Sequence, residues 1–360
     1  MTARPLYFVN WWVDSLAVGG LSILTAIALL ALADASDAAV LTPLVFPVAL
    51  LVNYPHFSAT VYRLYQNPEN LREFPVTAIG LPVLLVGAVT AGLCQPELIA
   101  PYFVMLYLLW SPYHYSGQTV GLTLVYARRA GFRIGRRERL ALSSFVFSAF
   151  LCGTIRMQQS VSHDGLIDLN GLLVPAFTFP PWLYWGAQAV MASGALLFCG
   201  FAIGLCLREK RLLPPIMLLP AATHFIWFVP GAELKAFWVI IPAFHSLQYL
   251  LIALFVQLKR RSEVAATAKC PTQSLAAEAM RWGIVNVIGG VLLFIGLPVG
   301  LVAIGFPPVT AFGLIIAAVN IHHFFVDGVI WKLREPATSS ALMTSLAELG
   351  GPAIPEAARA

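Results

Sequence analysis

Residues 320–334 read NIHHFFVDGVIWKLR and form the inner half of an apolar run that begins near Val309. The run is long enough for a membrane-spanning helix, because a bilayer core needs about 20 apolar residues. It carries two adjacent histidines, His322 and His323, and Asp327 lies one helical turn after His323. Polar groups at membrane depth are costly and usually bind something or line a path. This stretch therefore predicts a helical membrane protein with a buried polar site.

The composition of the whole chain agrees with a membrane protein. Of the 360 residues, 59% are hydrophobic and only 11% are charged, and the mean hydropathy is +0.80. Soluble domains contain about 25% charged residues. We therefore predict an all-α, polytopic integral membrane bundle, with one transmembrane domain over 1–335 and a short cytoplasmic tail over 336–360. The five cysteines are scattered without a CxxC pair, which argues against a disulfide framework or a thiolate metal site.

About ten membrane spans are expected from the apolar runs. Their approximate ranges are 11–33, 39–65, 76–94, 101–127, 140–156, 183–207, 213–230, 234–258, 281–305 and 309–333. Arginine and lysine gather in the even-numbered loops and are scarce in the odd-numbered ones, and positive residues favour the cytoplasmic side. Both termini are therefore expected in the cytoplasm, with the protein in an inner or plasma membrane. The basic loops indicate orientation and not a nucleic-acid partner.

One loop on the expected outer side, residues 156–182, mixes polar residues with proline and aromatics. It is either a lid on the membrane surface or an ordinary long connector. His163 and Asp164 lie in this loop and are not expected to be catalytic.

Five of the seven histidines fall at a similar depth in four predicted helices that run in the same direction. They are His56, His114, His245, His322 and His323. At about 1.5 Å per residue, they lie within roughly one to two helical turns of a common depth. If the four helices pack together, these side chains form one metal site. The alternative for each alone is a hydrogen-bonded packing residue, which is also the role expected for His224.

Polar neighbours accompany these histidines. The candidate catalytic groups are Asp327, Tyr113, Gln118 and Gln248. Asp327 follows His323 by four residues and shares its helix face, and the two glutamines follow their histidines at similar spacing. A metal-bound histidine usually donates its second ring N–H to a carboxylate, a carbonyl or water. We therefore expect Asp327 and the glutamines to orient ligands, and His323 to be favoured slightly over His322 as the ligand.

Neutral imidazoles suit iron, copper or zinc. With no cysteine nearby and at most one carboxylate, a four-histidine non-haem Fe(II) site is the first choice and copper is the second. A pair of these histidines is also able to bind haem axially. Non-haem iron, copper and haem all remain open alternatives at this point.

Four segments carry a resemblance to a known family: NYPHF (53–57), PYHYSG (112–117), FHSLQYL (244–250) and IHHFFVDG (321–328). In architecture and chemistry, these histidine-bearing helices resemble those of the Brp/Blh-like β-carotene dioxygenases. The resemblance covers only these helices. It implies an iron-dependent membrane enzyme that cleaves a carotenoid to retinal. It also implies that the iron ligands are His56, His114, His245 and one or both of His322 and His323.

The expected function is therefore a metal-dependent oxygenase that acts within the bilayer on a lipophilic substrate, such as a carotenoid, another isoprenoid or a lipid-like molecule. The small-molecule substrate and the surrounding membrane lipids are the expected partners. The alternatives are a transporter or channel and a haem-binding membrane subunit. Buried carboxylates are scarce in the sequence, which argues against a proton or cation relay.

Overall fold

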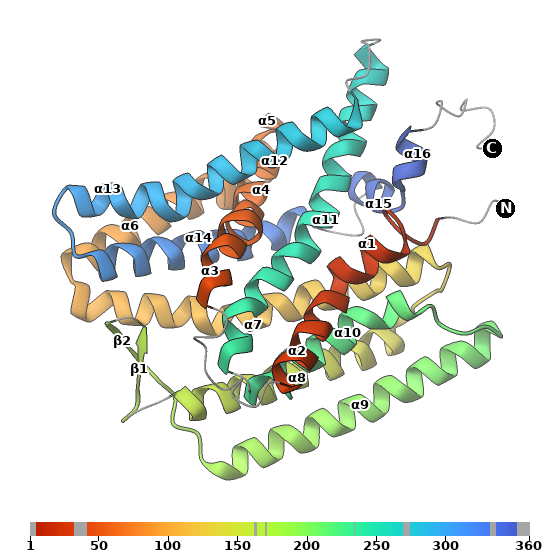
Figure 1. Ribbon diagram of the computed structural model, residues 1–360, viewed down its shortest axis with the longest axis horizontal. Coiled ribbons are helices and arrows are strands. Elements are labelled where there is room, and N and C mark those ends of the chain that lie inside the picture. Colours follow the sequence, from red (N-terminus) through yellow and green to blue (C-terminus); the bar gives the residue numbers. More distant parts are fainter. Residues whose placement is uncertain are drawn as a thin grey trace.

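The computed structural model describes residues 5–31, 42–161, 164–169, 171–233, 235–268, 274–331 and 336–350. The protein is 84% helical and forms a bundle of long helices (Figure 1). Within the described part of the chain, nine helices are long and apolar enough to cross a membrane. The prediction of an all-α, polytopic membrane bundle is confirmed.

The helices divide the chain as follows. The first half contains α1 Trp11–Ser15, α2 Leu21–Ala31, α3 Thr42–Val48, α4 Tyr54–Tyr65, α5 Pro68–Glu73, α6 Leu81–Cys94, α7 Pro96–Arg129 and α8 Arg136–Val161. The second half contains α9 Pro181–Glu209, α10 Pro215–Phe228, α11 Lys235–Ala268, α12 Leu275–Val291, α13 Leu297–Ala303, α14 Pro308–Ile330, α15 Pro336–Leu342 and α16 Leu346–Gly350. Five-residue π-helical segments continue several helices: η1 Leu16–Gly20, η3 Ala49–Asn53, η4 Val76–Gly80 and η6 Leu292–Gly296.

The predicted span 101–127 lies in α7, which is long enough to cross a bilayer but is not among the nine apolar helices. Its 34 residues extend for about 51 Å at 1.5 Å per residue. Polar residues such as His114 and Gln118 interrupt its apolar sequence. The same residues that lower the hydropathy of α7 bring polar groups into the middle of the bundle.

Four of the helices that carry histidines pack against one another. Helix α14 contacts α4, α6 and α7, and α4 also contacts α11 and α12. The π-helical segment η3 leads directly into α4, which begins two residues before His56. Such π-bulges frequently occur at functional sites. The long helix α9 packs on α8 and forms one edge of the bundle (Figure 1).

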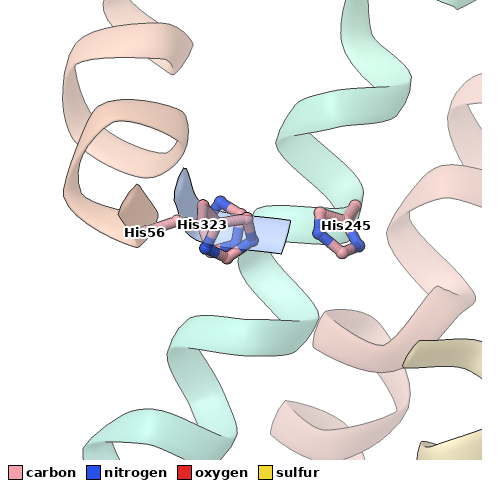
Figure 2. Close-up of side chains that lie close together, drawn as sticks. All are labelled: His56, His245 and His323. Carbon is pink, nitrogen blue, oxygen red and sulfur yellow. The ribbon is translucent and has the colours of Figure 1, made fainter. Parts of the chain in front are cut away.

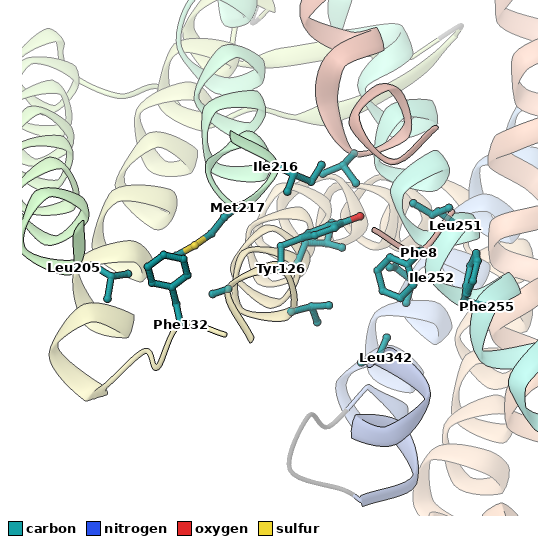
Figure 3. Packing of buried hydrophobic residues seen from close by; sticks show 14 residues of the cluster. Phe8, Tyr126, Phe132, Leu205, Ile216, Met217, Leu251, Ile252, Phe255 and Leu342 are labelled. Atoms are coloured by element: carbon teal, nitrogen blue, oxygen red, sulfur yellow. The ribbon is translucent and has the colours of Figure 1, made fainter. Parts of the chain in front are cut away.

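One end of the bundle holds the segments near both termini. Phe8 and Leu342 join a buried cluster with α7, α10 and α11 (Figure 3). Arg129 donates hydrogen bonds to the backbone carbonyls of Leu6, Tyr7, Leu342 and Thr344. The region expected as a tail, 336–360, thus begins with two short helices, α15 and α16, that belong to the folded unit. Residues 351–360 lie outside the described part of the chain.

The loop at the other end contains a β-hairpin that the sequence analysis did not predict. Strand β1, Leu166–Leu169, pairs antiparallel with β2, Leu172–Pro175. The missed signal is the sequence Asn-Gly at 170–171 between two apolar runs, which favours a two-residue hairpin turn. His163 lies outside the described residues. The hairpin and α15–α16 occupy opposite ends of the bundle (Figure 1).

Candidate metal centre

Three histidines from three helices meet in the interior. His56 of α4, His245 of α11 and His323 of α14 are only 1–2% exposed (Figure 2). Each offers one ring nitrogen, and the three nitrogens lie within 4.8 Å of one another. Such a separation allows one metal ion to be held between them.

His114 of α7 is the fourth member of the cluster. Its Nε2 lies 3.0 Å from Nε2 of His323. His114, His323 and Asp327 form a second group whose ligand atoms lie within 4.8 Å of one another. Since His323 belongs to both groups, the five side chains form one continuous site, which we call the histidine cluster: His56, His114, His245, His323 and Asp327.

The four imidazole rings surround a common point. The ring centroid of His56 lies 4.2 Å from that of His323 and 5.0 Å from that of His245. The centroid of His114 lies 4.7 Å from that of His323 and 5.0 Å from that of His245. The centroids of His245 and His323 are 6.4 Å apart. These separations place the midpoint between the His245 and His323 centroids about 3.2–3.7 Å from all four ring centroids. For comparison, an imidazole bound to a metal through a bond of about 2.1 Å has its centroid about 3.2 Å from the ion. The four ring centroids therefore lie around one point, and the ligand atoms close enough to hold an ion form the two groups of three that share His323.

Several ring nitrogens of the cluster have no partner. His56 Nε2 and both ring nitrogens of His245 are buried without a hydrogen bond in the described part of the chain. A buried polar group without a partner costs free energy comparable to a lost hydrogen bond or more. A divalent metal satisfies several such nitrogens at once, so the residues present fit a metal ion.

Hydroxyl groups hold the opposite nitrogens of two rings. Ser246 Oγ lies 2.9 Å from His56 Nδ1, and Thr60 Oγ1 lies 2.8 Å from His323 Nδ1. These contacts leave Nε2 of both rings for the centre of the cluster, as is usual for metal-ligating histidines. Neither hydroxyl was predicted from the sequence, because each lies on a different helix from the histidine that it contacts.

Asp327 occupies a different place from the one expected. Asp327 was predicted to orient His323 through the ring nitrogen that does not bind the metal, but Thr60 contacts that nitrogen, Nδ1. The carboxylate Oδ2 lies 3.3 Å from His323 Nε2 and 3.7 Å from His114 Nε2. Asp327 therefore faces the nitrogens that point into the cluster, and it is a candidate ligand instead of a support for one.

The two glutamines do not bond the imidazoles. Gln118 Nε2 donates to Gln248 Oε1 at 2.9 Å and to the carbonyl of His245 at 3.0 Å. Gln248 Nε2 donates to the carbonyl of Val18 at 2.5 Å. The expected role in orienting histidine rings is corrected: this pair ties α7 to α11 and to the first span, so it stabilises the packing around His245.

Tyr113 lies outside the cluster. Its side chain is 53% exposed and packs near Phe147 and Phe150 of α8. Adjacent residues on a helix point about 100° apart, so the inward orientation of His114 turns Tyr113 away. The structure does not bring Tyr113 to the histidine cluster, and its expected catalytic role stays a prediction.

The two remaining described histidines also lie apart from these groups. His322 is partly buried and belongs to neither metal-binding group, whereas His323 belongs to both. His224 is fully buried, and its ring bonds to Ser116, Thr119 and the carbonyl of Val146. These contacts satisfy the ring, which agrees with the packing role expected for His224.

In comparisons with known proteins, no protein-family model, no curated protein and no solved structure matches this chain. The resemblance to the Brp/Blh-like family thus stays an expectation from four short segments.

Proposed function

We propose that this membrane protein is a metal-dependent oxygenase whose metal is held by the histidine cluster. One observation carries the proposal: four imidazoles from four helices surround one buried point, and three of their nitrogens have no partner in the described part of the chain. His56, His114, His245 and His323 are the proposed histidine ligands. Asp327 lies close enough to be a fifth.

Iron in the Fe(II) state is the metal that we propose, with copper as the second candidate. Neutral imidazoles with one carboxylate suit iron, whereas structural zinc sites are almost always tetrahedral. The four imidazoles and Asp327 offer five candidate ligands, one more than a structural zinc site holds. When bound, Fe(II) supplies the electrons with which O₂ is activated.

Haem is a weaker candidate for this cluster. His245 and His323 are separated by 6.4 Å, which suits a bis-histidine haem. However, the rings of His56 and His114 both lie within 5.0 Å of each of these two rings. They fill the space where the porphyrin plane would have to pass. A non-haem metal needs no such space.

The substrate proposed is a lipophilic molecule that enters from the bilayer. Aromatic rings line the cluster. Between ring centroids, Phe57 lies 4.6 Å from His56, Phe324 lies 4.7 Å from His114, and Tyr115 lies 4.3 Å from His245. A carotenoid or other isoprenoid is the substrate class implied by the resemblance of the histidine segments. In the proposed reaction, one carbon–carbon double bond breaks and each carbon receives one atom of O₂. Two carbonyl products form, and no external reductant is consumed.

A transporter is the second function class, and the buried carboxylates argue against it. The other deeply buried carboxylates among the described residues, Asp14 and Glu278, have their own partners. Asp14 binds Tyr126 and two backbone N–H groups, and Glu278 binds Gln257 and Arg281. None of these contacts continues from Asp327 as a relay across the membrane.

Metal analysis of protein purified in detergent tests the proposal. We expect about one iron per chain and no Soret band. Protein freed of metal should regain activity with Fe(II), and turnover of a carotenoid under ¹⁸O₂ should label both carbonyl products. Stoichiometric haem, or full activity after complete metal removal, would contradict the proposed function.

A further inference from the structure

Thr60 lies at a junction between three helices. Its side chain is fully buried on α4, one turn after His56. Its Oγ1 lies 2.6 Å from Tyr249 Oη of α11, 2.8 Å from His323 Nδ1 and 3.3 Å from Asp327 Oδ1 of α14. One hydroxyl therefore contacts a proposed histidine ligand and the neighbouring carboxylate at once.

The number of protons determines the direction of these hydrogen bonds. A threonine hydroxyl donates one proton and accepts at two lone pairs. An ionised carboxylate only accepts, and metal ligands are deprotonated. Thr60 is therefore able to donate to only one neighbour; we assign that proton to Asp327, so that Thr60 accepts from Tyr249 and from His323, and the carbonyl of His56, 3.4 Å from Oγ1, is a more distant acceptor. This arrangement satisfies all three neighbours with the single proton that Thr60 has.

The hydrogen-bond directions set the tautomer of His323. When Nδ1–H donates to Thr60, the lone pair of the ring is on Nε2, the nitrogen that faces His114 Nε2 at 3.0 Å. In the other tautomer, Nε2 carries the proton and is unable to bind a metal. Thr60 thus selects the form of His323 that is able to be a ligand.

We propose that Thr60 is a positioning residue that holds His323 in its ligating tautomer and fixes the orientation of Asp327, with Tyr249 as the donor that completes its bonding. The inference rests on the proposed metal centre and adds how that centre is made ready for its ion. Ser246 has a simpler arrangement, because its Oγ contacts one imidazole, that of His56, besides Asn53 Oδ1 and the carbonyl of Pro242.

The test uses three variants of the full-length protein in detergent. Thr60→Val keeps the shape of the side chain and removes the hydroxyl, and Thr60→Ser keeps the hydroxyl. Thr123→Val is the matched control, because Thr123 is also buried (2% exposed) and its Oγ1 bonds to the Thr119 carbonyl on its own helix. Co(II) titration of metal-free protein measures the affinity, and the Co(II) absorption bands report the ligand field.

We expect Thr60→Val to weaken Co(II) binding about 10–100-fold and to change the absorption bands, as loss of an outer partner of a ligand does. Thr60→Ser and Thr123→Val should bind and absorb like the wild type. If Thr60→Val does not fold, Thr60→Ala takes its place in the same comparison. Wild-type binding by Thr60→Val, or equal losses in Thr60→Val and Thr60→Ser, would overturn the role of Thr60 alone. Wild-type protein that binds neither Co(II) nor Fe(II) would overturn the metal centre as well.

Discussion

The Nε2 atoms of His114 and His323 lie 3.0 Å apart, although 209 positions separate the two residues in the sequence. Two ligands at right angles on one ion, each at about 2.1 Å, have their nitrogens about 3.0 Å apart. The pair therefore has the spacing of neighbouring ligands. Because α7 and α14 pack directly on each other, the bundle holds this spacing through its backbone and not through a loop.

Alanine at single histidines should separate ligands from packing residues. We expect His56→Ala, His114→Ala and His245→Ala each to lower the metal bound per chain, since each removes one ring from around the shared point. His224→Ala is the control, because that ring is buried but bonds to Ser116, Thr119 and a backbone carbonyl. Metal stoichiometry of the folded variants is the measurement. Wild-type metal content in all three variants would return these histidines to a packing role.

The two adjacent histidines on α14 provide a second comparison. His323 contacts Thr60 and His114, whereas His322 belongs to neither metal-binding group. We therefore expect His323→Ala to lose bound metal and His322→Ala to retain most of it. The same metal analysis applies, and a greater loss in His322→Ala would reverse the assignment.

Asp327→Asn should weaken metal binding while the fold is kept. The substitution preserves the shape of the side chain but removes the negative charge that faces His323 Nε2 at 3.3 Å. Loss of a ligand or of its close partner costs about 10–100-fold in affinity or more. Asp14→Asn is the control, because Asp14 is also inside the bundle (0% exposed, against 8% for the side chain of Asp327) but binds Tyr126. Competition with a chelator of known affinity gives the dissociation constants, and equal values for Asp327→Asn and the wild type would exclude Asp327 from the centre.

Ser246→Ala should reduce metal affinity through His56. The change removes the hydroxyl that lies 2.9 Å from His56 Nδ1, so the ring loses the partner that fixes its orientation. We expect an effect of about 10-fold, at the lower end of the range for such partners. Ser22→Ala is the matched control, since Ser22 is a buried serine (1% exposed) whose Oγ donates to the carbonyl of Gly19 in the first span. Similar affinities for the two variants would leave Ser246 as a packing residue.

The depth of the histidines was readable from the sequence, because a transmembrane helix advances by a constant rise per residue. Counting along the predicted spans placed His56, His114 and His245 at one level. The identity of the neighbouring helices was not readable, because it depends on packing between segments far apart in the chain. That is why Thr60 and Ser246 were missed: each shares a helix with one histidine and supports another.

The direction of a side chain was less predictable than its depth. Spacing of four residues placed Asp327 on the same face as His323 correctly, since both lie in the cluster. The same reasoning does not apply to adjacent residues, which point about 100° apart, and Tyr113 turned outward for this reason. The β-hairpin was missed because the loop 156–182 was interpreted only as a lid or a connector, and the sequence Asn-Gly within it was not weighed.

Gly290→Ala should destabilise the protein near His56. A Cβ at position 290 would lie 2.6 Å from the carbonyl carbon of Tyr54, a backbone atom on α4 that has no room to move aside. Separating α12 from α4 to relieve this contact should cost about 1–3 kcal/mol. Gly87→Ala on α6 is the control, because nothing lies within 4 Å of its added Cβ. Thermal unfolding in detergent is the measurement, and an equal melting temperature for the two variants would contradict the close contact between α4 and α12.

Reporter fusions should place the two ends of the bundle on opposite sides of the membrane. Basic residues crowd the loop between α7 and α8, which predicts that a fusion after Arg139 lies in the cytoplasm. Helix α8 has 26 residues, about 39 Å at 1.5 Å per residue, so the hairpin that follows it emerges on the other side. A fusion after Asp168 should therefore report the outer side. A fusion after Thr344 should report the cytoplasm, because Arg129, at the end of α7, binds the Thr344 carbonyl and holds α15 and α16 beside that loop. A cytosolic fluorescent protein and an enzyme active only outside the cytoplasm measure each position, and the same side for Arg139 and Asp168 would exclude this topology.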